Sequence, residues 1–509
     1  MHYVSLIVEF LRGRPSLVFW CAALGQAALW TLTPALFYSA PPGDVPILLA
    51  IGHEFALGSY QGPPLAFWAG EIAFRLGGAF GLYLLAQICI VVTYWAVFAL
   101  GRATVGTRHA VLAVLLMAGI AAFTVPSPDF GPAIMAAPFW ALALLHYWRA
   151  LGEDRRGAWF LLAIDLGLLL LSNYAGIILV AVMILFTPLS VRGRYALRHP
   201  EPWIALLVFA IVVLPHALWL YFARGLVLAA YNASVTPGGL PPGVRLFATL
   251  LGAHLGLVLL LVLASGWPRK RRDRAPEIDR QPVAPLARGF IYAFAVAPAV
   301  AAVVIAFATH ELGPLNRITP LVVLSGLAVI VAAGDRVLLY RERITSSAWL
   351  GLLVVPPAMV VVALALMPLL VGLDLRIAQP ANSEGAFFAD SYQRRTGKPL
   401  DYVTGDPRIA PLVALGAASR PHVYFAWNGE LSPWASIADI RAKGGVIVWV
   451  VSDTGAAPPA DLKAQFPEMV PEVPRSFARA VQGVLPLIRL GWAVIRPQGE
   501  APSALSPAQ

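Results

Sequence analysis

Long apolar runs constrain the fold of this chain more than any other feature. They are roughly 14 to 23 residues long, close to the length that a helix needs to cross a hydrocarbon core of about 30 Å. The chain is 59% hydrophobic and only 13% charged, whereas soluble domains are roughly 45–50% apolar and about 25% charged. This composition excludes an ordinary soluble enzyme and predicts a polytopic α-helical membrane protein. The eleven predicted spans are 16–38, 82–100, 109–125, 132–148, 158–171, 175–190, 203–222, 245–266, 290–308, 318–334 and 348–370.

Basic residues predict the orientation of these spans. Residues 1–371 contain 24 Lys and Arg, and 20 of them fall in cytoplasmic loops if the N-terminus is cytoplasmic. The four on the other side are Arg75, Arg224, Arg245 and Arg317. This asymmetry follows the positive-inside rule, so the net charge of +10 is an orientation signal and does not indicate nucleic-acid binding. We expect a multi-pass protein of the plasma membrane, the inner membrane if the source is bacterial.

The chain divides by composition into a transmembrane domain, 1–371, and a tail, 372–509. An odd number of spans places the tail outside the cytoplasm, in the periplasm of a bacterium. Strand patterns at 400–404, 422–427, 446–451 and 490–496 alternate with helical patterns at 409–418, 434–442 and 459–466. Such alternation is typical of a small α/β domain, and Pro467, Pro471 and Pro474 predict loops between its elements. We interpret the tail as a supporting or acceptor-binding module.

Functional residues are expected where charge is scarce, on the outer face of the membrane domain. The acids there are Asp44, Glu54, Glu71, Asp129 and Glu311, accompanied by His53, His310 and the four outer arginines. Asp165 lies inside a predicted span and is interpreted as a hydrogen-bonded structural residue, with a proton relay as the alternative. His146, near the end of another span, is interpreted as a lone polar residue. No histidine pair has the spacing of metal ligands, and no metal or cofactor is predicted.

Four motifs on the outer side occur in a recognisable order. Gly43-Asp44 follows the first span and precedes Pro63-Pro64-Leu65-Ala66-Phe67-Trp68, Ser127-Pro128-Asp129 opens a later helix, and Ser172-Asn173-Tyr174-Ala175-Gly176 forms a short outer turn. The series resembles the polyprenyl-phosphate-sugar-dependent glycosyltransferases, which include the protein O-mannosyltransferases and the lipid A aminoarabinose transferase. The resemblance covers about residues 10–340. It implies the membrane fold called GT-C and a lipid-phosphate sugar donor.

The resemblance, together with the chemistry of this transfer, implies roles for the two aspartates. The departing phosphate is already a good leaving group, so one carboxylate that takes the proton of the acceptor hydroxyl suffices for inversion. Asp44 is the expected base. Asp129 either orients the acceptor or sugar, as the family suggests, or caps the helix that follows it.

An anionic donor also requires cations at the outer interface. Arg75 and Arg317, with Asn316 beside the latter, are the candidates, and the alternative for each arginine is contact with lipid headgroups. His53 and Glu54 are expected to supply further polarity for the substrate, or else to face water from an interfacial helix. Asn173 and Tyr174 are included because of the turn motif.

The chain departs from the family at three positions. Val45 replaces a second acid, Gly62 replaces a histidine or lysine, and Asn173 replaces a lysine. The leading hypothesis is an inverting glycosyltransferase that moves a sugar from polyprenyl phosphate to an envelope glycolipid, a polysaccharide or a protein. One alternative is a catalytically silent relative that binds an isoprenoid lipid or acts as a scaffold. The other is a lipid transporter or flippase, although the sequence has no internal repeat of the kind that such proteins show.

Overall fold

The computed structural model describes residues 13–226, 239–265, 282–315, 317–333, 342–451 and 457–497. The chain separates into two compact units. Phe37–Tyr60 belong to the second unit together with the residues from Val361 onward, and the remaining described helices form the first. Each unit is described by itself below.

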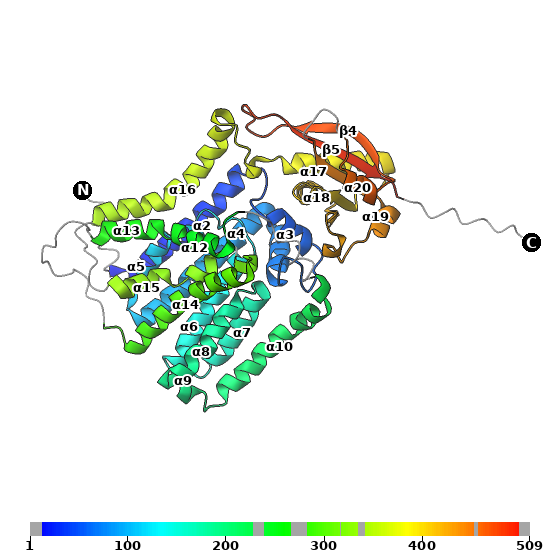
Figure 1. The fold of residues 1–509 in the computed structure, drawn as a ribbon. Coiled ribbons are helices and arrows are strands. Elements are labelled where there is room, and N and C mark those ends of the chain that lie inside the picture. The colour runs from blue at the N-terminus through cyan, green and yellow to red at the C-terminus, as the bar shows by residue number, and fades with distance from the viewer. Residues whose placement is uncertain are drawn as a thin grey trace, which may run out of the picture. The chain divides into compact units, whose positions relative to one another are not determined.

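Every predicted apolar run coincides with one helix or with two successive helices (Figure 1). Within the described residues, six helical stretches are long and apolar enough to cross a membrane, and four further apolar helices are shorter. The prediction of a multi-pass helical membrane protein is therefore confirmed, while the number of eleven crossings stays a prediction. The helices are α2 (Pro15–Phe37), α4 (Leu65–Thr104), α5 (Thr107–Met117), α6 (Pro132–Leu151), α7 (Ala158–Ser172), α8 (Gly176–Leu189), α9 (Val191–Ala196), α10 (Glu201–Phe222), α12 (Pro242–Ala253), α13 (Leu255–Ser265), α14 (Pro285–Thr309), α15 (Ser325–Ala333) and α16 (Glu342–Leu370).

Helix α4 is two helical segments joined by a kink at two glycines. Gly77 and Gly78 have non-helical dihedrals, and Gly78 has φ +59° with ψ −148°, a combination that is open almost only to glycine. The segment before the kink begins at Leu65 and carries Arg75, and the segment after it contains the predicted span 82–100. The glycine pair therefore lets a short helix and a long one follow each other in different directions.

Helix α6 lies at the centre of the first unit. It packs against α4 and α7, and fifteen of its twenty residues are buried. Tyr147 of this helix contacts the rings of Phe290 and Phe294 from α14 and hydrogen-bonds Thr187 of α8 at 2.7 Å. Asp165 is hydrogen-bonded, as its structural interpretation requires, and His146 is not a lone polar residue. The two side chains hydrogen-bond to each other between α6 and α7, so each satisfies the buried polar atoms of the other.

The second unit contains a five-stranded mixed sheet in the order β2-β1-β3-β5-β4. Strand β1 pairs in parallel with β2 and β3, whereas β5 pairs antiparallel with β3 and β4. The small α/β domain is thus confirmed, including all four strands and three helices that the sequence predicts. Its elements are α17 (Ala381–Thr396), β1 (Tyr402–Gly405), α18 (Ala410–Gly416), β2 (His422–Tyr424), α19 (Ile437–Lys443), β3 (Gly445–Val450), α20 (Ala460–Gln465), β4 (Val470–Phe477) and β5 (Ile488–Ile495).

The sequence does not predict strand β4, because Pro471 and Pro474 are typical of loops. The structure places both prolines in a strand that pairs only with β5, at the edge of the sheet. An edge strand needs N–H donors on one side only, and proline is tolerated there. The register shifts between Glu472 and Arg475, so Pro474 falls at an irregularity in the pairing.

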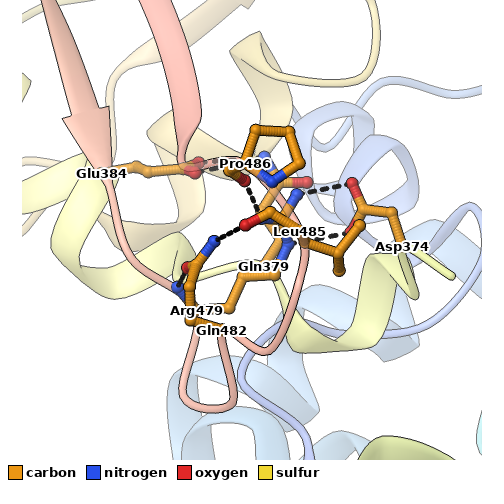
Figure 2. A network of polar contacts seen from close by, with 7 residues as sticks. All are labelled: Asp374, Gln379, Glu384, Arg479, Gln482, Leu485 and Pro486. Atoms are coloured by element: carbon orange, nitrogen blue, oxygen red, sulfur yellow. Dashed lines mark hydrogen bonds and ion pairs between the residues drawn. The ribbon is translucent and has the colours of Figure 1, made fainter. Parts of the chain in front are cut away.

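A polar network, in which Arg479 and Glu384 are buried, joins the segment after α16 to the sheet domain (Figure 2). Arg479 is 7% exposed and donates to both carboxylate oxygens of Asp374, at 2.9 and 2.7 Å, and to the carbonyl of Pro486. Nearby, Gln379 donates to the fully buried carboxyl group of Glu384. Burial raises the pKa of Glu384 from its ordinary value of 4.5 to about 7, although the Gln379 hydrogen bond and the positive charge of Arg479 oppose the change.

This shift predicts a pH dependence of stability. Between pH 4.5 and about 7 the folded state holds a proton on Glu384 that the unfolded state has lost, so the free energy of unfolding falls as the pH rises through this window. Replacing Glu384 with Gln keeps the shape and removes the titration. Thermal unfolding of the full chain in detergent between pH 4.5 and 7.5 should show a weaker loss of melting temperature in Glu384→Gln than in the wild type. Glu430→Gln, on the exposed surface of the same domain, is the control, and equal slopes for Glu384→Gln and wild type would contradict the prediction.

Candidate functional site

Asp129 lies in a turn whose backbone is held by hydrogen bonds. The hydroxyl of the fully buried Ser127 donates to the carbonyl of Thr124 at 2.7 Å, and the amide of Asp129 donates to the carbonyl of Pro126 at 3.1 Å. Gln87 of α4 donates to the Ser127 hydroxyl at 2.9 Å. A side chain from a neighbouring helix thereby fixes the turn that presents Asp129.

A second buried amide holds the 3-10 turn η1 (Ala121–Phe123), which leads to this segment. Gln26 of α2 donates to the carbonyl of Phe123 at 2.8 Å and also to the hydroxyl of Tyr94, at 3.0 Å. Sequence reasoning missed both Gln26 and Gln87. The available signal was an isolated amide within an apolar run, because such a group must find a partner inside the helix bundle.

Arg317 reaches Asp129 because the segment that carries it packs on η1. The short turn η3 (Thr319–Val322) is buried, and the Thr319 hydroxyl donates to the carbonyl of Ala122 at 3.4 Å. The Arg317 guanidinium then forms an ion pair with the Asp129 carboxylate, 188 positions away in the sequence. The Asp129 side chain is 13% exposed and that of Arg317 39% exposed, so part of the guanidinium faces outward.

The helix-cap alternative for Asp129 is wrong. Helix α6 begins at Pro132 and its N-cap is Gly131, so Asp129 does not occupy the cap position. Pro132 at the first helical position lacks an N–H, which leaves one donor fewer to be satisfied at this end of the helix. The ion pair with Arg317 occupies the Asp129 carboxylate in its place.

Arg75 is also paired with a carboxylate. Its Nε lies 2.8 Å from Glu71, one turn earlier on α4. Glu71 is 1% exposed, whereas the Arg75 side chain is 53% exposed. The buried negative charge of Glu71 is therefore balanced from the surface by Arg75.

Asp44 precedes a short helix, α3 (Val45–Gly52), within the predicted first outer loop. Gly43 has φ +56°, which explains why glycine stands before the aspartate where the chain turns into α3. The Asp44 side chain makes no capping hydrogen bond and is exposed, so its carboxylate is not used by the helix that follows it.

His53 and Glu54 lie just after α3, in the second unit. The Glu54 carboxylate, 8% exposed, accepts a hydrogen bond from His422 Nδ1 at 2.7 Å, and the rings of His53 and His422 lie 5.4 Å apart. The sequence offered His422 only as the first residue of a strand pattern. Its pairing with Glu54 was not predicted.

Asn173 and Tyr174 form the turn between α7 and α8. Asn173 is 3% exposed, and its side-chain oxygen accepts the amide hydrogen of Ala175 at 2.8 Å. The Tyr174 hydroxyl lies 3.0 Å from Nε2 of His216. Both residues have structural contacts of their own, and their contact with a substrate stays a prediction. Asn316 lies outside the described residues.

The candidate residues fall in both units. Asp129, Arg317, Arg75, Asn173 and Tyr174 belong to the first unit, and Asp44, His53 and Glu54 belong to the second. Within the first unit, the Asp129 carboxylate lies on a turn held by hydrogen bonds and is paired with the partly exposed Arg317 guanidinium. This arrangement is suited to orienting a polar or anionic ligand. Within the described ranges, no three His, Cys, Asp or Glu side chains cluster as metal ligands.

Comparison with known proteins supports the resemblance noted in the sequence. Residues 61–219 match the family model of dolichyl-phosphate-mannose-protein mannosyltransferases. The matched segment includes Arg75, Asp129, Asn173 and Tyr174, but neither Asp44 nor Arg317. The resemblance is therefore confirmed over this part of the chain. The comparison with curated protein sequences gives no match.

Solved structures of an archaeal oligosaccharyltransferase are also similar to this chain. The apo enzyme from Archaeoglobus fulgidus has 14% sequence identity and a TM-score of 0.42 over 79% of this chain. The enzyme AglB of the same organism, in complex with an inhibitory peptide and a dolichol-phosphate, has 15% identity and a TM-score of 0.39 over 81% of the chain. The matches cover 63% and 64% of the lengths of those proteins.

The Asp129–Arg317 pair predicts energetic coupling between two distant segments. Asp129→Asn and Arg317→Gln should each lower the melting temperature of the full chain. The double variant should lose less than the sum, with a coupling free energy on the order of 1 kcal/mol for a partly exposed pair. Glu201→Gln, which breaks the Arg156–Glu201 contact on the exposed surface, is the control and should have a smaller effect. Strict additivity of the two substitutions would show that the contact does not contribute to stability.

Proposed function

We propose that this protein is a membrane glycosyltransferase that moves one sugar from a polyprenyl phosphate to an acceptor on the outer face of the membrane. The observation that carries the proposal is the family match over residues 61–219, which includes the turn that presents Asp129. The spans long enough to cross a membrane agree with a lipid-linked donor. The acceptor is an envelope glycolipid, a polysaccharide or a protein.

Asp44 is the proposed general base. Its carboxylate is exposed and makes no capping bond, so it is available to accept the proton of an acceptor hydroxyl. The acceptor oxygen then attacks the anomeric carbon, the bond from that carbon to the phosphate oxygen breaks, and the configuration inverts. The polyprenyl phosphate leaves as an anion, so no acid has to protonate it.

Arg317 and Asp129 are proposed to orient the reactants. The guanidinium is partly exposed while it is paired with Asp129, and a guanidinium has five N–H donors, so further donors are available for the phosphate. Asp129 holds this guanidinium and can accept a hydroxyl hydrogen bond from the sugar or the acceptor. Arg75, half exposed beside Glu71, is a second proposed contact for the anionic head.

Substitution of Asp44 tests the proposal. Mass spectrometry of envelope glycolipids, polysaccharides and proteins, from cells with and without this protein, should reveal a product that lacks one sugar. Asp44→Asn should reduce formation of that product by at least about 100-fold, the usual contribution of a general base, while membrane insertion and melting temperature stay unchanged.

Asp461→Asn provides the matched control, because Asp461 is an exposed aspartate in the first turn of α20 in the same unit. Expressed in cells that lack the wild-type protein, this variant should restore the product fully. If Asp44→Asn also restores the product, Asp44 is excluded as the base. Unchanged envelope glycans in the cells that lack the protein would exclude sugar transfer to those acceptors.

A further inference from the structure

The segment Phe37–Tyr60 is built into the α/β unit by its backbone. The amides of Ser39 and Ala40 both donate to the carbonyl of Ile377, at 2.8 and 3.2 Å. Ala40 also packs in a small buried cluster with Ala381 of α17 and Leu412 of α18. The segment that precedes the proposed base, Asp44, is thereby fixed to the α/β unit.

Helix α3 continues this attachment on the other side of Asp44. It packs on α18 and on β2. A shallow pocket between them is lined by Pro46, Leu49 and His53 on the α3 side and by Ala414 and Pro421 on the domain side. Because Asp44 immediately precedes α3, any shift of this helix against the domain moves the proposed base as well.

The end of α3 is held by the Glu54–His422 contact. The chain turns sharply here, since Phe55 has φ +49°, a conformation that is unfavourable for a bulky residue and persists only where surrounding contacts enforce it. Glu54, which contacts His422 at 2.7 Å, directly precedes Phe55, so this contact is one of those that hold the turn.

The surroundings of His422 determine its charge. The groups that face it are the Glu54 carboxylate, the His53 and Tyr402 rings, and the charges of Asp401 and Lys443. The hydrogen bond with Glu54 raises the pKa of His422 above its ordinary value of 6.5, while burial and Lys443 oppose the change. The ion pair is therefore complete below pH 6.5 and is lost as the pH rises through the raised pKa.

We infer that Glu54 and His422 are positioning residues for sugar transfer, and that the α/β domain holds helix α3 so that Asp44 stays in its reactive position. The inference rests on the proposed function, and it assigns the domain a role in the turnover step. Neither residue has to touch the substrate. Because a small displacement of a base lowers the rate of reaction more than the affinity for a ligand, loss of the contact acts on kcat.

Kinetics of three variants test this role. Glu54→Gln should lower kcat about tenfold or more and leave the KM of the lipid donor within twofold. His422→Lys keeps a positive charge up to about pH 10, so it should retain more of its kcat between pH 7 and 8.5 than the wild type does. Glu472→Gln, which breaks the Arg395–Glu472 pair elsewhere in the same domain, is the matched control and should leave both constants unchanged.

Hydrogen exchange of residues 39–54 in the full chain gives a readout that does not depend on activity. Protection, corrected for intrinsic rates, should be higher at pH 6 than at pH 8.5 in the wild type, and lower in Glu54→Gln at pH 6. Reduced protection with an unchanged kcat in Glu54→Gln would overturn the positioning role and leave the proposed function intact. Unchanged protection would show that the Glu54–His422 contact does not hold this segment. Absence of sugar transfer by the wild type would overturn the proposed function and this inference together.

Discussion

Hydrogen bonds from polar side chains buried among apolar helices are the interaction on which the first unit depends. A bilayer offers no water, so an amide or hydroxyl between helices must find a protein partner. Gln26 and Gln87 find theirs in the turn that leads to Asp129. The hydrogen bonds that offset the cost of burying these two amides therefore also fix the turn. A residue that orients a substrate requires such a fixed position.

The two units use charge in different ways. In the first, Arg317 and Asp129 are partly exposed and come from segments 188 positions apart, so their contact exists only when η3 is packed on η1. In the second, Arg479 and Glu384 are almost fully buried, and hydrogen bonds surround both. The partial exposure of Arg317 leaves donors for a ligand, whereas the buried Arg479 uses its donors on Asp374 and Pro486 and joins two segments of the domain.

Much of the fold could be predicted from the sequence because hydrophobic length and strand alternation are local signals. The apolar runs each became helices, and the four predicted strands formed. Strand β4 could not be predicted, since whether a proline is tolerated depends on the position of the strand in the sheet, which is not a local property. Asp129 and Arg317 were selected singly as rare outer charges, but their pairing depends on the docking of η3. The contact of Glu54 with His422 spans 368 positions, and no local pattern encodes it.

The edge position of β4 has a consequence for how the α/β domain meets other molecules. An unpaired sheet edge is a template onto which another strand can add, either from a second copy or from an extended peptide. Pro471 and Pro474 lack N–H groups, and the irregular register between Glu472 and Arg475 interrupts the row of acceptors and donors. Strand addition at the β4 edge is therefore unfavourable, and a peptide or a second copy that binds at this edge would have to do so through side chains and not by pairing with β4.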